Sequence, residues 1–383
     1  MTAYETVPIG PLAGYTIGIT AARRREELGA ALERRGARIT YAPAIRIVPL
    51  ADDSRLRAAT ERCLEVPLDI VVATTGIGFR GWIETADTWG LAGKLTDAIG
   101  RATVLARGPK ARGAVRSAGL REAWSPESES SSEVLAYLMA DPGLAGRRIA
   151  VQLHGEPLPD VVDTLRLAGA EVIEVPVYSW KPPADHAPLR RLVEDVCTAA
   201  VDAVAFTSAP AAASFLRAGD EQDRSALVAA ALGGRVLAAC VGPVTAGPLT
   251  RRGIPVIQAS RGRLGALVRE IVEQVPVRCG TRLPAAGHWL DVRGHAVAVD
   301  GRLVPLSFAA MALLRMLCGQ PGHVASRADL LRTLPGEGSD EHAVEVAVGR
   351  LRTALGDPRI VQTVVKRGYR LAYEPERAGS WRY

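Results

Sequence analysis

Cysteine is scarce in this chain, and its five residues lie far apart: Cys63, Cys197, Cys240, Cys279 and Cys318. Without a CxxC pair the sequence argues against a zinc site and a disulfide framework, and we expect buried free thiols. No apolar run approaches the ~18 residues that a membrane span needs. The N-terminus also lacks the basic start and apolar core of a signal peptide. These absences predict a cytoplasmic protein with no metal site and no membrane partner.

Lysine is also rare, with 4 of the 47 basic residues, so the positive charge is carried by arginine. The chain has a formal net charge of +6, and its distribution is uneven. Residues 281–383 carry 14 Arg and Lys against 10 Asp and Glu, a net charge of +4, and residues 346–373 carry six basic residues and one acidic. A basic cluster on a small domain is typical of a nucleic-acid contact, although a solvated charged face gives the same composition.

The first 275 residues alternate short β-branched runs with helical stretches, which predicts parallel sheets in an α/β architecture. Candidate strands are 16–20, 69–74, 102–106, 148–153, 202–207 and 235–242. Helical stretches follow at 25–37 and 159–170, and each ends in a glycine suited to a helix C-cap.

Three pairs of segments repeat in the same order within this part. TIGITAARRREELGAALERRGARITYAP resembles RRIAVQLHGEPLPDVVDTLRLAGAEVIEVPVY, DIVVATTGIGFRGWI resembles DAVAFTSAPAAASFL, and TVLARGPKARGAVRSAGL resembles VLAACVGPVTAGPLTRRGI. Matched elements in one order indicate two copies of a single α/β unit.

The pattern changes after Gly287. Residues 276–287 have the Pro and Gly content of a linker, and residues 288–307 alternate as a small antiparallel sheet with a hairpin turn at Asp300–Gly301. Helices are predicted at 307–320, 326–334 and 340–356, and residues 359–373 read as two strands around the basic tip 366–368.

The third of these helices has two different faces on a helical wheel. Val344, Ala347, Val348, Leu351 and Leu355 share the face that must pack inward. The opposite face is poorly suited to ordinary solvation and well suited to a DNA major groove, where Arg reads guanine edges. It presents His342, Val346, Gly349, Arg350 and Thr353, flanked by Glu345 and Arg352.

The segments DGRLVPLS, SRADLL, VEVAVGRLRTALGDP and VQTVVKRGYRL together resemble the winged-helix output domain of OmpR/PhoB-type response regulators. The resemblance covers about 85 residues and implies that the third helix enters the major groove of double-stranded promoter DNA. Applied to this chain, the resemblance implies that the base edges are contacted by residues from the set His342, Glu345, Val346, Gly349, Arg350 and Arg352. It assigns Thr363, Lys366 and Arg367 to phosphates or the minor groove, and it implies a dimer on DNA.

A phosphoacceptor receiver does not precede this domain, because the first strand ends in Thr20–Ala21–Ala22–Arg23 where a receiver needs acidic residues. GYTIGITAARR, VPVYSW, AFTSAPAAASF and AACVGPVTAGPLTRRGIPV instead resemble uroporphyrinogen-III synthase, which cyclises a linear tetrapyrrole. This implies a two-lobed, flavodoxin-like parallel-sheet fold over 1–275, followed by an α+β winged-helix domain at 288–375. One lobe would comprise 1–38 and 183–275, the other 50–171, with connecting strands at 39–49 and 172–182.

A tetrapyrrole precursor carries many carboxylates, so its cleft should offer hydroxyls, cations and helix N-termini. The strand-end loops supply such groups, although ordinary turns and caps also use Gly, Ser and Thr. The cleft candidates are Thr75, Gly76, Lys110, Tyr178, Ser208 and Thr245. The resemblance implies no cofactor and points to no catalytic residue.

Three functions remain open at this stage. The first is a transcription regulator whose synthase-like part senses a tetrapyrrole-like or other anionic ligand; this domain order resembles actinobacterial regulators of nitrate and nitrite assimilation. The second is a bifunctional uroporphyrinogen-III synthase that also binds DNA. In the third, the synthase-like part is a scaffold that contacts a partner transcription factor.

Overall fold

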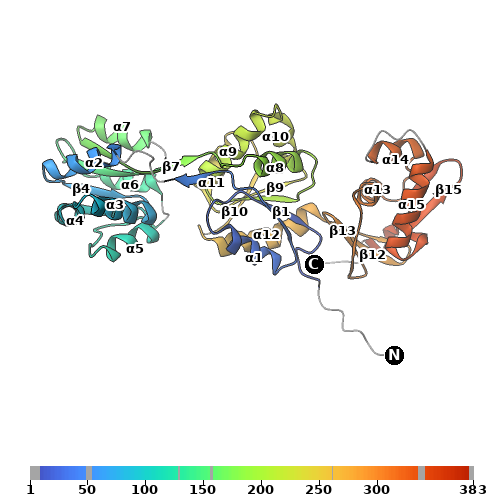
Figure 1. The fold of residues 1–383 in the computed structure, drawn as a ribbon. Coiled ribbons are helices and arrows are strands. Elements are labelled where there is room, and N and C mark those ends of the chain that lie inside the picture. The colour runs from blue at the N-terminus through green and yellow to red at the C-terminus, as the bar shows by residue number, and fades with distance from the viewer. Residues whose placement is uncertain are drawn as a thin grey trace. The chain divides into compact units, whose positions relative to one another are not determined.

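The computed structural model describes residues 9–48, 54–127, 130–155, 158–260, 262–334 and 341–378. The chain divides into two compact units (Figure 1). The first unit comprises residues 1–45 and 183–383, and the second comprises residues 46–182. The predicted combination of parallel sheets followed by a small antiparallel sheet with helices is confirmed.

A five-stranded sheet forms the centre of the second unit, in the order β3-β7-β6-β4-β5. Its strands are parallel except for β3, which runs antiparallel to β7. The strands are β3 (Arg46–Val48), β4 (Ile70–Ala73), β5 (Thr103–Ala106), β6 (Arg148–Gly155) and β7 (Glu171–Lys181). The helices are α2 (Ser54–Glu65), α3 (Gly76–Thr88), α4 (Ala92–Arg101), α5 (Pro109–Ser117), α6 (Ser131–Met139) and α7 (Pro159–Leu167).

Helices cover both faces of this sheet, because successive strand residues point to opposite sides and both sides are apolar. On one face, Phe79 and Trp82 of α3 pack with residues of α2, α4 and α5. On the other face, Val134 of α6 and Leu165 of α7 pack against Val151 and its neighbours. The result is the three-layer arrangement expected of a parallel sheet.

The first unit contains a fully parallel sheet in the order β10-β9-β8-β1-β2. Its strands are β1 (Thr16–Ile19), β2 (Arg38–Tyr41), β8 (Ala203–Phe206), β9 (Leu237–Cys240) and β10 (Val256–Gln258). Its helices are α1 (Arg25–Glu33), α8 (Ala187–Cys197), α9 (Ala209–Asp220), α10 (Ser225–Gly233), α11 (Pro243–Thr250) and α12 (Leu264–Cys279).

The strand order repeats between the two sheets. The series β5-β4-β6-β7 matches β9-β8-β1-β2, element for element in the order that the sequence repeat predicts. β10 lies outside β9, and the second unit has a parallel bridge between Leu105 and Trp124 at the same place beside β5. The chain therefore holds two copies of one α/β unit.

The rest of the first unit is a small α+β domain. Its antiparallel sheet contains β11 (Thr281–Ala285), β12 (His288–Val292), β13 (Ala296–Val299) and β14 (Arg302–Pro305). It continues through α13 (Phe308–Gly319), α14 (Arg327–Thr333), α15 (Glu341–Leu355), the 3₁₀ turn η1 (Pro358–Ile360), β15 (Val361–Val364), β16 (Gly368–Leu371) and α16 (Pro375–Ala378). Position 340, the predicted start of the third helix, lies outside the described residues.

Local signals explain how several of these elements begin and turn. Ser307 and Ser326 cap α13 and α14 by accepting hydrogen bonds from the backbone N–H groups of Ala310 and Asp329. Asp300 and Gly301 both have positive φ, 49° and 80°, as a two-residue hairpin of the predicted kind requires.

The segment 276–287, expected to be a linker, is regular structure instead. It contains the end of α12 and then β11, which pairs with β12. Pro276 lies in the last turn of α12, and Pro284 lies on the edge strand of its sheet, where a missing N–H is tolerated. The prolines that suggested a linker thus occupy two positions that regular elements allow.

No described helix combines the length and the apolar character required to span a bilayer.

Candidate functional site

The helix α15 is held by the apolar face that its periodicity predicts. Val344, Val348, Leu351 and Leu355 are buried in the core of the small domain, and Ala347 is partly buried against it. These contacts fix the rotation of the helix about its own axis. The opposite face is therefore presented to solvent.

That opposite face carries most of the predicted groove readers in exposed positions. His342, Glu345, Val346, Gly349 and Arg350 are all exposed. A side chain at position 349 would meet nothing within 4 Å, so the glycine leaves an open notch beside Arg350. An exposed face of this kind leaves room for the close approach of a DNA edge and offers a cation that could contact guanine.

Arg352 differs from the other predicted groove readers because it is half-buried. Its Nε donates to the main-chain oxygen of Val361 at 2.7 Å, and its Nη2 donates to Thr363 Oγ1 at 2.9 Å. The guanidinium also lies over the Tyr369 ring, 5.7 Å from its centroid. Arg352 and Thr363 are thus engaged with each other, and the guanidinium joins α15 to the terminal hairpin.

Glu345 is part of a small charged group on the same side of α15. Its carboxylate lies 3.4 Å from Arg327 and 3.7 Å from His342. Arg327, which the sequence did not single out, also lies over the Tyr369 ring at 5.6 Å. Two arginines on this one aromatic ring hold α14, α15 and β16 together.

The hairpin of β15 and β16 has the predicted basic tip. Lys366 and Arg367 are exposed, and Val365 between them and β15 is 77% exposed. Lys366 and Gly368 have positive φ, and a side chain at Gly368 would collide with the Ala325 backbone. The tip therefore presents two cations on a tight turn, and cationic side chains of this kind are suited to phosphate contacts.

In the second unit, Thr75 and Tyr178 meet at the carboxyl edge of the sheet. Thr75 caps α3 by accepting the Gly78 N–H at 3.2 Å, and its Oγ1 lies 3.4 Å from the Tyr178 hydroxyl. Tyr178 is buried on β7 and makes an edge contact with Trp180. The Gln152 amide, which the sequence did not indicate, donates to Thr75 Oγ1 at 2.9 Å.

Gly76 and Lys110 are brought together through their backbones. A Cβ at Gly76 would collide with the main-chain oxygen of Lys110, so α3 and α5 pack closely at their N-terminal turns. The Lys110 side chain is exposed beside this contact. These two predicted cleft residues therefore lie at the same carboxyl edge of the sheet as Thr75 and Tyr178.

Ser208 and Thr245 belong to the first unit and occupy the equivalent edge of its sheet. Ser208 caps α9 by accepting the Ala211 N–H at 3.4 Å. Thr245 is buried in the first turns of α11, which begins at Pro243. The two units thus present matched helix N-termini at their carboxyl edges, where open α/β sheets bind ligands.

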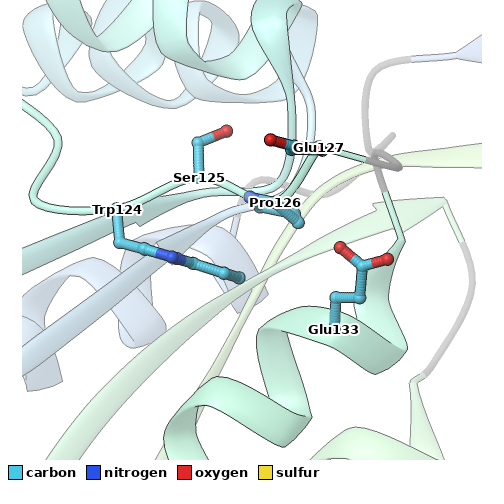
Figure 2. A pocket seen from close by; sticks show the side chains of 5 residues that line it. All are labelled: Trp124, Ser125, Pro126, Glu127 and Glu133. Carbon is cyan, nitrogen blue, oxygen red and sulfur yellow. The ribbon is translucent and has the colours of Figure 1, made fainter.

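A separate pocket of about 630 Å³ lies beside Trp124, which forms a parallel bridge with Leu105 of β5 (Figure 2). Trp124, Ser125, Pro126 and Glu127 line it from a loop, and Glu133 lines it from α6. Trp124 stacks on Tyr137 at a ring distance of 4.2 Å. No predicted cleft residue lines this pocket, and its two carboxylates do not suit an anionic ligand.

The titratable groups of the described residues do not form a metal site, since no group of three His, Cys, Asp or Glu gathers among them. All five cysteines are free, but the expectation that all are buried is only partly met: Cys63, Cys240 and Cys318 are buried, whereas Cys197 and Cys279 are partly exposed. Burial raises the pKa of Cys63, Cys240 and Cys318 to about 12. Burial also raises the pKa of Asp202 to about 6, although its hydrogen bond from Thr16 lowers it.

Comparison with known families assigns each part of the chain. The sequence profile of uroporphyrinogen-III synthase HemD matches residues 26–269, more than half of the chain. The profile described as "Transcriptional regulatory protein, C terminal" matches residues 301–371. Both matches agree with the parts that the sequence resemblances predict.

Individual relatives follow the same division. The uncharacterized protein YjjA of Bacillus subtilis is 29% identical over 263 residues, covering 68% of this chain and 96% of that protein. The transcriptional regulatory protein CutR of Streptomyces coelicolor is 34% identical over 108 residues, 28% of this chain. The chain covers 50% of that regulator's length.

Among solved structures, a mutant uroporphyrinogen III synthase from Thermus thermophilus is similar with a TM-score of 0.56. It is 28% identical, and the match covers 68% of this chain and 98% of that one. The predicted synthase fold followed by a winged-helix domain is therefore confirmed.

Proposed function

Because the chain belongs to the uroporphyrinogen-III synthase HemD family and ends in an OmpR/PhoB-type DNA-binding domain, we propose that it is a ligand-responsive transcription regulator. The observation that carries this proposal is the joining of both parts in one chain. The synthase-like part would sense a tetrapyrrole-like anion, and the winged-helix domain would bind promoter DNA as a dimer.

The DNA-binding half of the proposal is supported by the exposed face of α15 and the basic tip. Arg350 is exposed beside the notch at Gly349, and Lys366 and Arg367 extend from the hairpin. Bidentate contact of an arginine with guanine gives sequence selectivity, and cations on phosphates give affinity.

The ligand-binding half is supported by the carboxyl edges of the two parallel sheets. Each edge carries a hydroxyl-capped helix N-terminus, at Thr75 and at Ser208, and Lys110 adds a cation beside the first. Helix N-termini favour carboxylates through their dipole and their backbone N–H groups. A polycarboxylate ligand matches both features.

We extend the proposal to control of nitrate and nitrite assimilation genes. Its support is a resemblance in domain order to regulators of that class. The chemical link is sirohaem, the nitrite reductase cofactor, which is made from uroporphyrinogen III.

The experiment for DNA binding is a footprint of the full chain on the promoters of its own gene neighbourhood, at several salt concentrations. We expect at least one protected segment that outlasts competition by random DNA, with affinity falling as salt rises. If every promoter fragment bound no better than random DNA, the regulator proposal would fail.

A second candidate, a synthase that also binds DNA, is favoured by the extent of the HemD match over residues 26–269. The measurement is turnover of hydroxymethylbilane by the full chain, with porphyrin isomers separated after oxidation. Excess isomer III over the spontaneous isomer I would establish the enzyme. Isomer I alone from folded protein would leave a sensor or a protein-binding scaffold.

A further inference from the structure

The buried amide of Gln152 has one end bonded and the other end without a partner. The side chain is fully buried on β6, and its Nε2 donates to Thr75 Oγ1 at 2.9 Å and to the Thr75 main-chain oxygen at 3.3 Å. Its Oε1 has no hydrogen-bond partner among the described residues. A buried acceptor left unsatisfied destabilises the folded state, so its retention requires a reason.

The orientation of this amide follows from its neighbours. The Thr75 main-chain oxygen can only accept, so the nitrogen end of Gln152 must face it. Reversing the amide would set two oxygens against each other and leave the nitrogen unbonded. The unpartnered atom is therefore an acceptor, and what satisfies it must be a donor.

The first unit contains an internal comparison for this arrangement. Ile17 pairs with Ala203 as Ile149 pairs with Ile70, which makes Thr20 the equivalent of Gln152. The Thr20 hydroxyl is also buried, but it donates to the Ala205 main-chain oxygen at 2.9 Å and leaves nothing unsatisfied. A short hydroxyl thus fills this position in the other copy of the fold.

A second difference accompanies the first. Counting from the capping residues Thr75 and Ser208, Gly78 is the equivalent of Ala211. A Cβ at Gly78 would collide with the Gln152 amide and also with Val177 Cγ2 and Thr75 Oγ1, whereas the Cβ of Ala211 is accommodated. The second unit therefore has a glycine inside a helix, where glycine has a low propensity, beside a buried amide with an unsatisfied oxygen.

We propose that Gln152 Oε1 is a ligand-recognition atom that accepts a hydrogen bond from an N–H group of the bound molecule. The identity of the donor rests on the proposed function: it is a pyrrole N–H of an open-chain tetrapyrrole. The amide lies near the carboxyl end of β6 beside the N-terminus of α3, so one molecule can place a carboxylate at the helix and an N–H at Gln152. The donor reaches the buried oxygen when the side chains over it move on binding.

The test replaces the amide by the hydroxyl of the first unit, with the substitution Gln152→Thr in the full chain. Gly78 is kept, because a Cβ there would also collide with Val177 and Thr75. Two probes are compared by quenching of tryptophan fluorescence in rapid mixing. Hydroxymethylbilane carries carboxylates and pyrrole N–H groups, and mellitate carries carboxylates alone. We expect the Gln152→Thr variant to bind hydroxymethylbilane at least tenfold more weakly and mellitate as the unchanged chain does.

Thermal unfolding without ligand gives a second readout. We expect the variant to remain folded at the assay temperature, because the Thr75 main-chain oxygen still accepts the Phe79 N–H and Thr75 Oγ1 still accepts the Gly78 N–H.

The remaining outcomes separate the inference from the proposed function. Unchanged binding of hydroxymethylbilane by the variant, or equal weakening of both probes, overturns the inference and leaves the ligand-sensing proposal standing. Failure of the unchanged chain to bind hydroxymethylbilane overturns the tetrapyrrole proposal itself, and the assignment of the donor with it.

Discussion

Arg352 Nε donates to the main-chain oxygen of Val361 across 2.7 Å, which joins the exposed helix of the DNA-binding domain to its terminal hairpin. Arg350, about half a turn away, makes no such hydrogen bond with the residues that the structure describes, and it is exposed. Two arginines that the sequence assigns to the same DNA contact therefore differ in what their guanidinium groups bind. Substituting each arginine in turn should distinguish an effect on DNA binding from an effect on the stability of the domain.

We expect Arg350→Ala to weaken binding to the promoter by roughly 5- to 150-fold, because one bidentate arginine–guanine contact gives about 1–3 kcal/mol. Its thermal unfolding should stay within error of the unchanged chain. Arg352→Ala should lower the unfolding temperature as well as the affinity, because the Val361 oxygen and the Tyr369 ring lose their partner. Fluorescence anisotropy and calorimetry measure the two quantities.

Arg352→Lys is the matched control for this pair, since it keeps the charge and loses the planar fork. It should restore little of the unfolding temperature. Equal effects of Arg350→Ala and Arg352→Ala on stability would contradict the division of roles.

The basic tip predicts a change in salt dependence. Replacing Lys366 and Arg367 by Ala should weaken binding to all sequences alike and lower the slope of log affinity against log salt by about 0.9 per lost phosphate contact. Titrations at several salt concentrations give the slope. Replacing Arg101 and Arg121 of the second unit by Ala removes the same two charges outside the DNA-binding domain, and an equal change of slope there would refute a local contact.

Asp202 predicts a pH-dependent stability. Burial raises its pKa to about 6, while the Thr16 N–H and the Arg315 cation lower it. A carboxyl with a raised folded pKa adds stability below its unfolded pKa, near 4, and loses that contribution as pH rises to about 6. The free energy of unfolding should therefore fall over this window, on the order of 3 kcal/mol for this group.

Asp202→Asn keeps an oxygen to accept the Thr16 N–H at 2.7 Å and does not titrate. Chemical denaturation from pH 4 to 7 should show the decline in the unchanged chain and a flatter profile in the variant. His295 titrates nearby with a lowered pKa, an effect in the opposite sense that both proteins share. Parallel profiles would exclude Asp202 as the source.

Local and periodic signals predicted much of the fold from sequence. The buried face of α15 followed from its apolar spacing, and the hairpin at Asp300–Gly301 followed from a dipeptide that tolerates positive φ. The internal repeat predicted two equivalent sheets because each copy must bury its own apolar faces. These features depend on residues that are close in sequence or recur in order.

The features missed from sequence depend on contacts between distant segments. Gln152 meets Thr75 across 77 residues of chain, and nothing near either residue indicates the pairing. Arg352 belongs by spacing to the exposed face, yet its long side chain reaches back to Val361. The linker prediction rested on Pro276 and Pro284, which a helix end and an edge strand accommodate.

Two glycines of α3 predict opposite effects of the same substitution. A Cβ at Gly76 would collide with the Lys110 main-chain oxygen, whereas a Cβ at Gly81 would meet nothing within 4 Å. Gly81→Ala should raise stability by up to about 1 kcal/mol through helix propensity alone. Gly76→Ala should lower it, because α3 and α5 must separate. Thermal unfolding of the full chain measures both changes.

The pair also bears on ligand binding, because only Gly76 lies at the carboxyl edge beside Thr75 and Lys110. Separation of α3 and α5 should weaken mellitate binding in Gly76→Ala, while Gly81→Ala should bind mellitate as the unchanged chain does. Weakened binding in both variants would point to loss of helix dynamics rather than to the edge. Unchanged binding in Gly76→Ala, with its stability reduced, would remove this edge from the proposed ligand site.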